Sequence, residues 1–234
     1  MGIKQRQERD RESVRRSILD AARELFVNEG YHNVSIRKIA ERIEYSPAAI
    51  YSYFPSKDDI FYALAEEGFR LLCDSEGADE RAVLETLAPL ERLRTIFRRF
   101  YEFSRQHPQY FALMFIDRSV PRISREYERF AFAREVKSDL VAQIQACLNE
   151  GVFASSVNPH TVLRLITAGL LGVVVMKLSD RLAPGDDADL LADDVLNAVL
   201  TGLQAGAVIQ SKGPDTGRIA GPGVDEEEEN VQAS

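Results

Sequence analysis

Cysteine, histidine and tryptophan are scarce in this sequence of 234 residues, which has two cysteines, three histidines and no tryptophan. Cys73 and Cys147 stand alone in apolar stretches, without the spacing of a zinc site or of a disulfide framework. The histidines have no carboxylate or cysteine at ligand spacing. We therefore expect buried, reduced thiols, no metal site and no cofactor.

Long apolar runs and catalytic signatures are missing as well. The longest apolar stretch, residues 170–176, is interrupted by Gly172 and closed by Lys177, whereas a membrane-spanning helix needs ~20 apolar residues. The first sixteen residues are rich in Arg, Gln and Glu and lack the apolar core of a signal peptide. Neither a glycine-rich phosphate loop nor a nucleophile elbow is present. We expect a cytoplasmic protein that is not an enzyme and has no membrane partner.

Positive charge is in deficit, and the formal net charge of −8 would on its own argue against a nucleic-acid partner. Residues 1–57, however, contain eleven Lys or Arg and eight Asp or Glu, a net charge of +3, so that residues 58–234 carry −11. The charge is therefore divided between a mildly basic first quarter of the chain and a strongly acidic remainder.

Apolar residues recur three and four positions apart, without the alternation that strands show. With 45% apolar and 28% charged residues, the chain can bury the core of one or two domains. Ser35, Ser46, Ser56 and Asn158 have the type and position of helix N-caps. These patterns predict an all-α fold with helices at about 14–29, 36–43, 47–54, 56–72, 89–106, 108–117, 121–150, 159–181 and 187–209.

Residues 35–54 carry the most informative pattern. Two turns of helix, a tight break and a second short helix with a capped N-terminus form the plan of a helix-turn-helix, whose second helix enters the DNA major groove. Ile50 and Phe54 fall on the inward face of that helix. Small side chains on the outward face allow close approach to DNA, and a tyrosine can reach a phosphate. The outward residues are Ser46, Pro47, Ala48, Tyr51 and Ser52.

Several segments in the first third of the chain resemble a known family. They are residues 22–26 (ARELF), 30–31 (GY), 35–40 (SIRKIA), 46–54 (SPAAIYSYF) and 56–59 (SKDD). Over roughly residues 12–72 the chain resembles the DNA-binding domain of the TetR/AcrR helix-turn-helix transcriptional regulators. The resemblance implies phosphate or base contacts by Ser35 and Arg37, a recognition-helix role for Tyr51 and a phosphate contact by Lys57. With the outward face, the candidate DNA-binding residues are Ser35, Arg37, Ser46, Pro47, Ala48, Tyr51, Ser52, Tyr53 and Lys57.

Two of these positions have alternatives. Tyr53 has an equally simple role in packing against the first helix, and Ser35 would serve as an N-cap without DNA. One position departs from the family, which usually has glycine in the turn between the two short helices, where this chain has Glu44 before Tyr45. If Glu44 is left-handed, the strain is about 1 kcal/mol.

Ten of the twenty aromatic residues fall between residues 97 and 132. Core packing explains this concentration, and so does an apolar cavity that admits a small hydrophobic effector, with methionines as adaptable walls. For the cavity we expect walls from Phe97, Phe100, Met114, Phe115, Phe130 and Met176. Arg99 and Arg118 are candidates to pair with an acidic effector, but charge along one side of a helix is usually solvated, and we favour that explanation for both.

Small residues recur in the last two predicted helices, although a glycine inside a helix costs ~1 kcal/mol relative to alanine. Close helix–helix contact compensates for this cost, either within one chain or between two. The family resemblance implies the second case, a homodimer joined by a four-helix bundle. The candidate interface residues are Leu165, Gly169, Gly172, Val173, Ala198, Gly202 and Ala205.

The chain is thus expected to have an arm (1–11), a TetR-type DNA-binding domain (12–72, motif 35–54), a helical effector-binding and dimerisation domain (73–210) and a disordered acidic tail (211–234). A linker helix would join the three-helix head to the larger domain. We expect a repressor that leaves a palindromic operator in double-stranded DNA when its effector binds. The alternative is a helical small-molecule-binding or scaffolding protein that has lost DNA binding.

Overall fold

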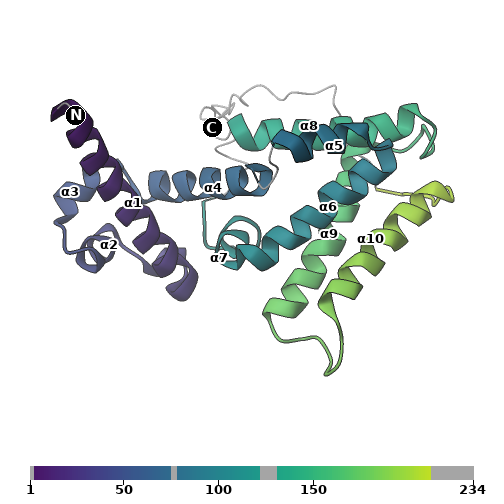
Figure 1. Cartoon of the computed structure of the whole chain (residues 1–234). Coiled ribbons are helices and arrows are strands. Elements are labelled where there is room, and N and C mark those ends of the chain that lie inside the picture. The colour runs from purple at the N-terminus through teal and green to yellow at the C-terminus, as the bar shows by residue number, and fades with distance from the viewer. Residues whose placement is uncertain (1–2, 75–77, 122–130, 212–234) are drawn as a thin grey trace, which may run out of the picture.

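A computed structural model of the chain describes residues 3–74, 78–121 and 131–211, and every regular element in these ranges is a helix. The expected all-α architecture is confirmed. A head at the left of Figure 1 is joined by one long helix, α4, to a larger body at the right. The helices are α1 (Ile3–Glu29), α2 (Ile36–Arg42), α3 (Pro47–Tyr51), α4 (Lys57–Asp74), α5 (Ala78–Thr86), α6 (Pro89–Gln106), α7 (Pro108–Phe111), α8 (Ala131–Asn149), α9 (Pro159–Leu178) and α10 (Ala188–Gln204), with a 3-10 turn at Tyr31–Asn33 and a π-helical segment at Ala112–Ile116.

The two short helices of the head begin at side-chain caps. The Ser35 hydroxyl oxygen accepts a hydrogen bond from the backbone N–H of Lys38 at 3.2 Å, and the Ser46 hydroxyl oxygen accepts one from Ala49 at the same distance. Pro47 follows as the first residue of α3, where its missing N–H leaves no bond unmade. The N-caps predicted for both helices are confirmed.

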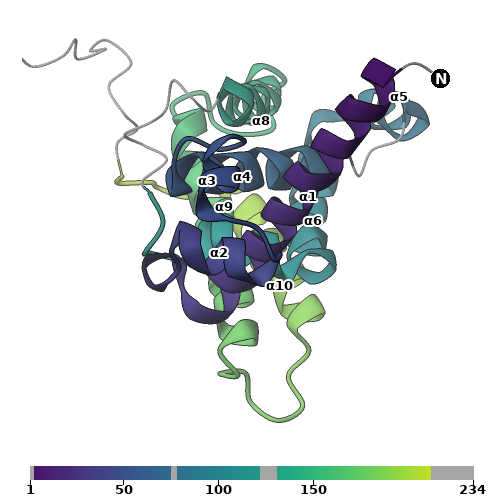
Figure 2. The same cartoon turned by 90° about the vertical axis from the view of Figure 1, so that its left-hand side faces the viewer.

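Apolar side chains from α1, α2, α3 and the first turns of α4 form the core of the head. Figure 2 looks onto this end of the molecule and shows α1, α2 and α3 gathered in front of α4. Because α4 contributes to this core and then continues into the body, a movement of α4 carries the head with it. The core residues are Ile18, Ala22, Phe26, Ile39, Ile50, Phe54, Ile60, Phe61 and Leu64.

Helix α4 begins at a cap that differs in detail from the predicted one. The Ser56 hydroxyl oxygen accepts the backbone N–H of Asp59 at 3.2 Å, as a capping box requires. The carboxylate of Asp59 then accepts from the Ser56 hydroxyl at 2.6 Å, so the bond joins the two side chains. The sequence thus predicts the start of α4 correctly.

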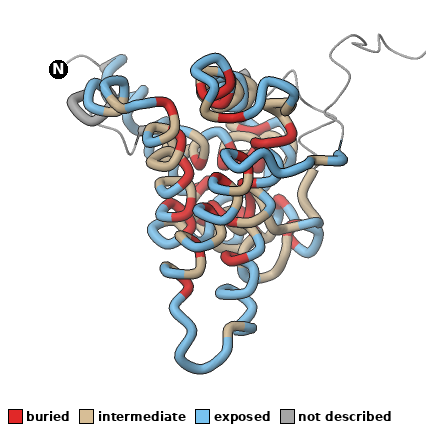
Figure 3. The backbone as a smooth tube through the Cα atoms, turned by 90° about the vertical axis from the view of Figure 1, so that its right-hand side faces the viewer, coloured by how far each residue is buried: buried red, intermediate tan, exposed pale blue. Residues whose placement is uncertain are grey.

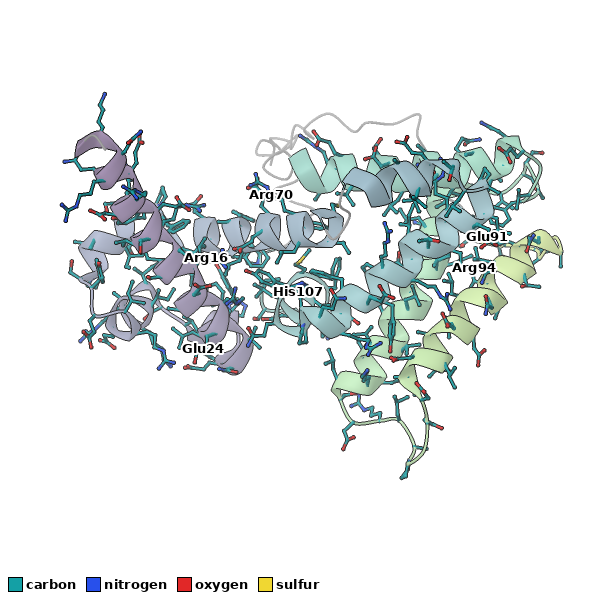
Figure 4. The ribbon with its side chains drawn as sticks, viewed as in Figure 1. Arg16, Glu24, Arg70, Glu91, Arg94 and His107 are labelled. Carbon is teal, nitrogen blue, oxygen red and sulfur yellow. The ribbon has the colours of Figure 1, made fainter. Side chains whose placement is uncertain are left out.

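In the body, α6 packs against α8, α9 and α10, while α9 and α10 form an antiparallel hairpin that extends below the rest of the body in Figure 1. Polar bonds join α6 to α10: Arg98 Nε donates to Asp193 at 2.7 Å, and the Tyr101 hydroxyl donates to Asp189 at 2.8 Å. Arg94, labelled in Figure 4, bonds Asn197 in the same interface. These bonds line one side of α6 and hold α10 against it.

Judged by length and composition alone, helix α9 is long and apolar enough to cross a membrane. The sequence predicted no membrane-spanning helix, because its longest unbroken apolar stretch is short. In the structure α9 packs against α6, α8 and α10. A third of its most apolar window is buried inside the chain. Figure 3 shows that most residues along the lower part of the hairpin formed by α9 and α10 are exposed.

The structure departs from the predicted helices at several places. The helix α5 and the 3-10 turn were not predicted, and the helix expected at 108–117 divides into α7 and a π-helical segment. Of the helix expected at 121–150, the structure describes Ala131–Asn149. The tail expected at 211–234 lies almost wholly outside the described residues, and so do residues 1 and 2 of the arm.

Candidate DNA-binding face and effector cavity

The helix α3 presents a small, polar face to solvent. Ile50 is fully buried beneath it, whereas the Tyr51 side chain is 54% exposed. Ser46, Pro47 and the other members of the predicted outward face are exposed as well, so this face is open to a macromolecular partner. The exposed members are Ser46, Pro47, Ala48, Tyr51 and Ser52.

Glu44, in the turn between α2 and α3, has a φ of 58° and is therefore in the left-handed region, where the family usually has glycine. A side chain at this φ brings its Cβ close to backbone oxygen, at a cost of about 1 kcal/mol. The backbone of the turn is hydrogen-bonded next to Glu44, where the N–H of Tyr45 donates to the carbonyl of Ala40 at 2.9 Å. The turn therefore has the required geometry with an unfavourable residue at its centre.

Each basic side chain of α2 has an acidic partner. Arg37 bonds Glu41 at 2.9 Å along the same helix. The other two cations pair with α1, through a Lys38–Glu29 ion pair and an Arg42–Glu24 ion pair, the latter at 2.6 Å. Glu24 is labelled in Figure 4. Side chains of these pairs are partly exposed, so the pairs are weak and can open toward phosphate.

Lys57, the first residue of α4, is held by the turn before α2. Its ammonium donates to the carbonyls of Tyr31 at 2.8 Å and of Val34 at 3.0 Å, and lies 4.0 Å from the centre of the Tyr31 ring. Partial burial lowers the pKa of the Lys57 ammonium. An ammonium has three protons, so one donor remains for a phosphate. The sequence missed this anchoring, because nothing in the pattern brings residues 31 and 57 together.

Tyr53 is half-buried and packs on the core of the head, with the Arg11 guanidinium of α1 5.8 Å from its ring. This placement favours the packing role of Tyr53 over DNA contact. Tyr45, by contrast, is 45% exposed beside α3, where sequence reasoning assigned it no role. Tyr45 is thus a second exposed tyrosine, in the turn that precedes α3.

A cavity of about 1110 Å³ lies in the body, bounded by α4, α5, α6, α8 and α9. This is slightly larger than the ~300–1,000 Å³ of ordinary small-molecule sites. Its apolar walls include three aromatic side chains that pack on one another: the ring centres of Phe115 lie 6.0 Å from Phe69 and 5.3 Å from Phe100. The body therefore contains a site that suits an apolar ligand.

Three of the predicted wall residues, Phe97, Phe100 and Phe115, line this cavity, and so does Arg99. Two predictions are corrected. Met114 is buried where the π-helical segment meets α4, and Met176 of α9 is 40% exposed, so neither is among the residues that line the cavity. Phe130 lies outside the described residues.

The candidate interface residues divide between two environments. Val173 is buried in the core of its own chain, and Gly169 lies where α9 approaches α10, since a Cβ on it would come within 2.6 Å of Val195. Gly169 therefore serves close contact within the chain. The others are exposed or partly exposed: Leu165, Gly172, Ala198, Gly202 and Ala205.

The head and the body meet at α7. Arg23 of α1 donates a hydrogen bond to the Tyr110 hydroxyl at 2.7 Å, and its guanidinium lies 5.0 Å from the centre of that ring. Burial, in the first place, raises the pKa of the Tyr110 hydroxyl. A second bond joins the backbone N–H of Tyr31 to the hydroxyl oxygen of Ser119 at 3.1 Å. These bonds fix the angle between the two parts.

The π-helical segment is in tight contact with α4. A Cβ at Gly68 would overlap the sulfur of Met114 and come within 3.2 Å of Tyr110, so a side chain at this position would require Met114 to shift. Phe115, one residue further on, is part of the cavity wall. The π-helical segment thus joins the cavity wall to α4, which itself contributes Phe69 and Leu72 to that wall. No pattern in the sequence marked Gly68, because its role depends on a crossing of distant helices.

No group of His, Cys, Asp or Glu in the described ranges is arranged to hold a metal ion. Cys147 is buried, and burial raises the pKa of its thiol to about 11. That thiol is therefore protonated near neutral pH and unreactive.

The fold and the two sites define a class, the helix-turn-helix proteins that join a DNA-binding head to a ligand-binding body. Two family models match the sequence: bacterial regulatory proteins of the tetR family at residues 18–64, and the tetracyclin repressor-like C-terminal domain at residues 93–199. The chain belongs to the TetR/AcrR family of transcriptional regulators.

Among curated relatives, the transcriptional repressor Rv1474c of Mycobacterium tuberculosis is 43% identical over 53 residues, which are 23% of this chain and 28% of the relative. The transcriptional activator FasR of Mycolicibacterium smegmatis is 30% identical over 105 residues, 45% of this chain and 47% of the relative. The chain thus matches less than half the length of each of these relatives.

Among solved structures, the regulator FadR of Bacillus subtilis in complex with stearoyl-CoA superposes with a TM-score of 0.65 at 18% sequence identity. The match covers 80% of this chain and 97% of FadR. At this identity the likeness shows the fold, which extends through head and body alike.

Proposed function

We propose that the chain is a homodimeric repressor, acting in the cytoplasm, that binds a palindromic operator through α3 and is released when a small hydrophobic effector enters the cavity. The observation that carries this proposal is the short connection between cavity and head. Phe115 lines the cavity, and the neighbouring Met114 touches α4 at Gly68. A ligand that displaces Phe115 therefore acts on the helix that carries the head.

On the DNA side, α3 is the recognition helix and its exposed face enters the major groove. Tyr51 and the serines at its two ends contact phosphates or base edges. Ser35, Arg37 and Lys57 contact the flanking phosphates, where the N-termini of α2 and α4 favour anions. Because the cations of α2 already have acidic partners, we expect modest non-specific affinity and marked salt sensitivity.

The homodimer would form through the hairpin of α9 and α10. Large apolar side chains are exposed there in the single chain, which is the arrangement expected of a surface that a partner covers. A two-fold axis through this surface would place the recognition helices ~34–36 Å apart, one turn of DNA. The exposed side chains are Leu165, Val175, Met176, Leu178 and Leu190.

Effector and operator would compete through the distance between the two heads. A ligand that binds more tightly to the state with the wrong head spacing shifts the population away from the DNA-binding state. The FadR structure with stearoyl-CoA supports an effector with a long apolar portion, because the same fold accommodates one there. The curated relatives include a repressor and an activator. We propose repression for this chain, because a protein that leaves its operator when an effector binds frees the gene for transcription.

The experiment that tests this proposal measures operator binding and effector binding on the same protein. A labelled duplex from the region upstream of the gene is titrated with the full chain, first alone and then with a panel of hydrophobic compounds. The proposal requires that a compound which binds the body also lowers operator affinity. Compounds that bind without any change in operator affinity would overturn the link between the two sites.

A further inference from the structure

We propose that the ligand of the cavity is an amphipathic anion, whose apolar tail lies among the aromatic side chains and whose head group binds Arg92 of α6. This inference rests on the proposed effector-binding function and adds the chemical class of the ligand. It starts from the distribution of charge in the cavity wall.

The two charged side chains that lie deepest in the wall are both cations. All the acidic residues of the wall are exposed, whereas Arg92 and Arg99 are half-buried. They lie on the same side of α6, two turns apart, as positions i and i+7 do. For Arg92, withdrawal from water is costly unless an anion accompanies the cation. The exposed charged residues of the wall are Glu85, Glu135, Lys137, Asp139 and Arg164.

Arg92 is held firmly by neutral acceptors. One guanidinium nitrogen, Nη2, donates to the carbonyls of Glu85 at 2.7 Å and of Leu87 at 3.0 Å. The other, Nη1, donates to the side-chain oxygen of Gln143 at 3.3 Å. All three acceptors are uncharged, and Arg92 forms no ion pair with an acidic side chain in the described ranges. The guanidinium is thus positioned with its charge uncompensated.

The remaining nitrogen of Arg92, Nε, is buried and has no hydrogen-bond partner among the residues described. A buried donor without an acceptor destabilises the fold, and more so when it carries charge. A carboxylate or phosphate group beside the guanidinium would supply the missing negative charge. Among ligand head groups, only an anion does so.

The rest of the cavity fits an apolar tail. Phe69, Phe100 and Phe115 pack edge to face around one part of it. Aliphatic side chains from α4, α6, α8 and α9 complete the wall, and the volume of about 1110 Å³ leaves room for a long chain. The aliphatic side chains are Leu72, Ile96, Val136, Leu140, Leu163 and Leu171.

The first experiment needs no variant. Calorimetric titrations of the full chain compare dodecanoate, dodecyl phosphate, dodecanol and dodecyltrimethylammonium, each below its micelle concentration and at one ionic strength. At least one of the two anions is expected to bind about tenfold tighter than dodecanol, and the cation weaker than dodecanol. The tighter of the anions identifies a carboxylate or a phosphate head group. Equal binding of dodecanol and both anions would overturn the proposal.

The second experiment separates the charge of Arg92 from its structural role. Gln143→Glu places a carboxylate against the guanidinium in a side chain of the same shape, so the bond that holds Arg92 is kept or strengthened. We expect this variant to bind the preferred anion about tenfold more weakly and dodecanol unchanged. Arg92→Gln should show the same selective loss. Arg94→Gln is the matched control, because Arg94 lies on α6 and outside the cavity wall.

Unchanged anion binding in Gln143→Glu would contradict the assignment of Arg92, since an anion at the guanidinium cannot ignore a new carboxylate. Operator release is measured separately on the same samples. An anion that binds but leaves operator affinity unchanged would disprove the proposed coupling and leave the ligand class intact. If dodecanol released the protein from the operator and neither anion bound, the proposed ligand class would be disproved and the proposed coupling would stand.

Discussion

Arg23 of α1 and Tyr110 of α7 are joined by a hydrogen bond of 2.7 Å between the guanidinium and the phenol oxygen. The two residues are 87 positions apart in sequence, and they connect the DNA-binding head with the body. The guanidinium also lies 5.0 Å from the centre of the Tyr110 ring. Since Tyr110 is itself close to Gly68 on α4, this contact joins the three helices that meet between the two sites.

Tyr110→Phe removes this hydrogen bond while keeping the ring. If the contact transmits the effector signal, the variant binds effector as the parent does but releases the operator less completely, with the coupling reduced by about 0.5–2 kcal/mol. Operator titrations with and without a bound effector measure this quantity.

Tyr101→Phe is the matched control for that experiment. It also removes a tyrosine hydroxyl bond, to Asp189, but within the body. The role of Tyr110 would be disproved if both variants changed coupling equally, or if neither did.

Glu44→Gly is expected to stabilise the chain by about 1 kcal/mol, because glycine adopts the left-handed conformation without a Cβ penalty. The melting temperature should then rise by roughly 2–4 °C, with operator preference unchanged. Asp180→Gly is a useful companion, since Asp180 has a φ of 52° in the loop between α9 and α10, far from DNA. A fall in melting temperature for Glu44→Gly would show that its side chain compensates for the strain.

Lys57→Ala is expected to weaken operator binding across all sequences and to reduce the salt slope by about one unit, as the loss of one phosphate contact does. Operator affinity measured at several salt concentrations gives that slope. Because Lys57 also anchors α4 to the carbonyls of Tyr31 and Val34, circular dichroism must show that the variant is folded. Lys177→Ala, in the body, serves as the control. A salt slope equal to that of the parent would remove Lys57 from the phosphate contacts.

The ion pair between Arg98 and Asp193 gives a prediction about pH. Bonding to Arg98 lowers the pKa of the Asp193 carboxyl in the folded state. The pair therefore stabilises the fold at pH values above the ordinary aspartate pKa of ~3.9, and this contribution is lost as the pH falls through the lowered value. Both side chains are more than a third exposed, so its size is below ~1 kcal/mol.

Asp193→Asn should accordingly lower the free energy of unfolding at pH 7, and the difference from the parent should shrink as the pH approaches 3. Urea titrations at several pH values measure it. Asp194→Asn is the control, because Asp194 is exposed and forms no ion pair within the described ranges. A difference that grew on acidification would have the wrong sign for this explanation.

The head could be predicted from the sequence because its signals are local. Ser35, Ser46 and Pro47 mark helix starts within four residues of themselves, and the left-handed Glu44 follows from the short turn between two helices. Ion pairs such as Arg42–Glu24 could not be predicted, because they depend on how α1 crosses α2.

The body was predicted less completely, for the same physical reason. A stripe of aromatic residues predicts an apolar interior without deciding which side chains face a cavity. Phe100 and Phe115 face it, whereas Met114 is turned toward α4. No sequence pattern identified Arg92 as a ligand-binding residue. Its guanidinium is surrounded by uncharged acceptors only when α5, α6 and α8 pack together.

The central claim, that α3 holds this chain on DNA, is tested most directly by fluorescence anisotropy of a labelled duplex from the region upstream of the gene. The parent protein is compared with Tyr51→Ala, whose substituted side chain is exposed and supports no core packing. We predict saturable, salt-sensitive binding by the parent and a loss of at least about tenfold in affinity in the variant. Equal affinities of parent and variant, or no binding beyond that to unrelated DNA, would contradict the claim and favour a ligand-binding protein that has lost its operator.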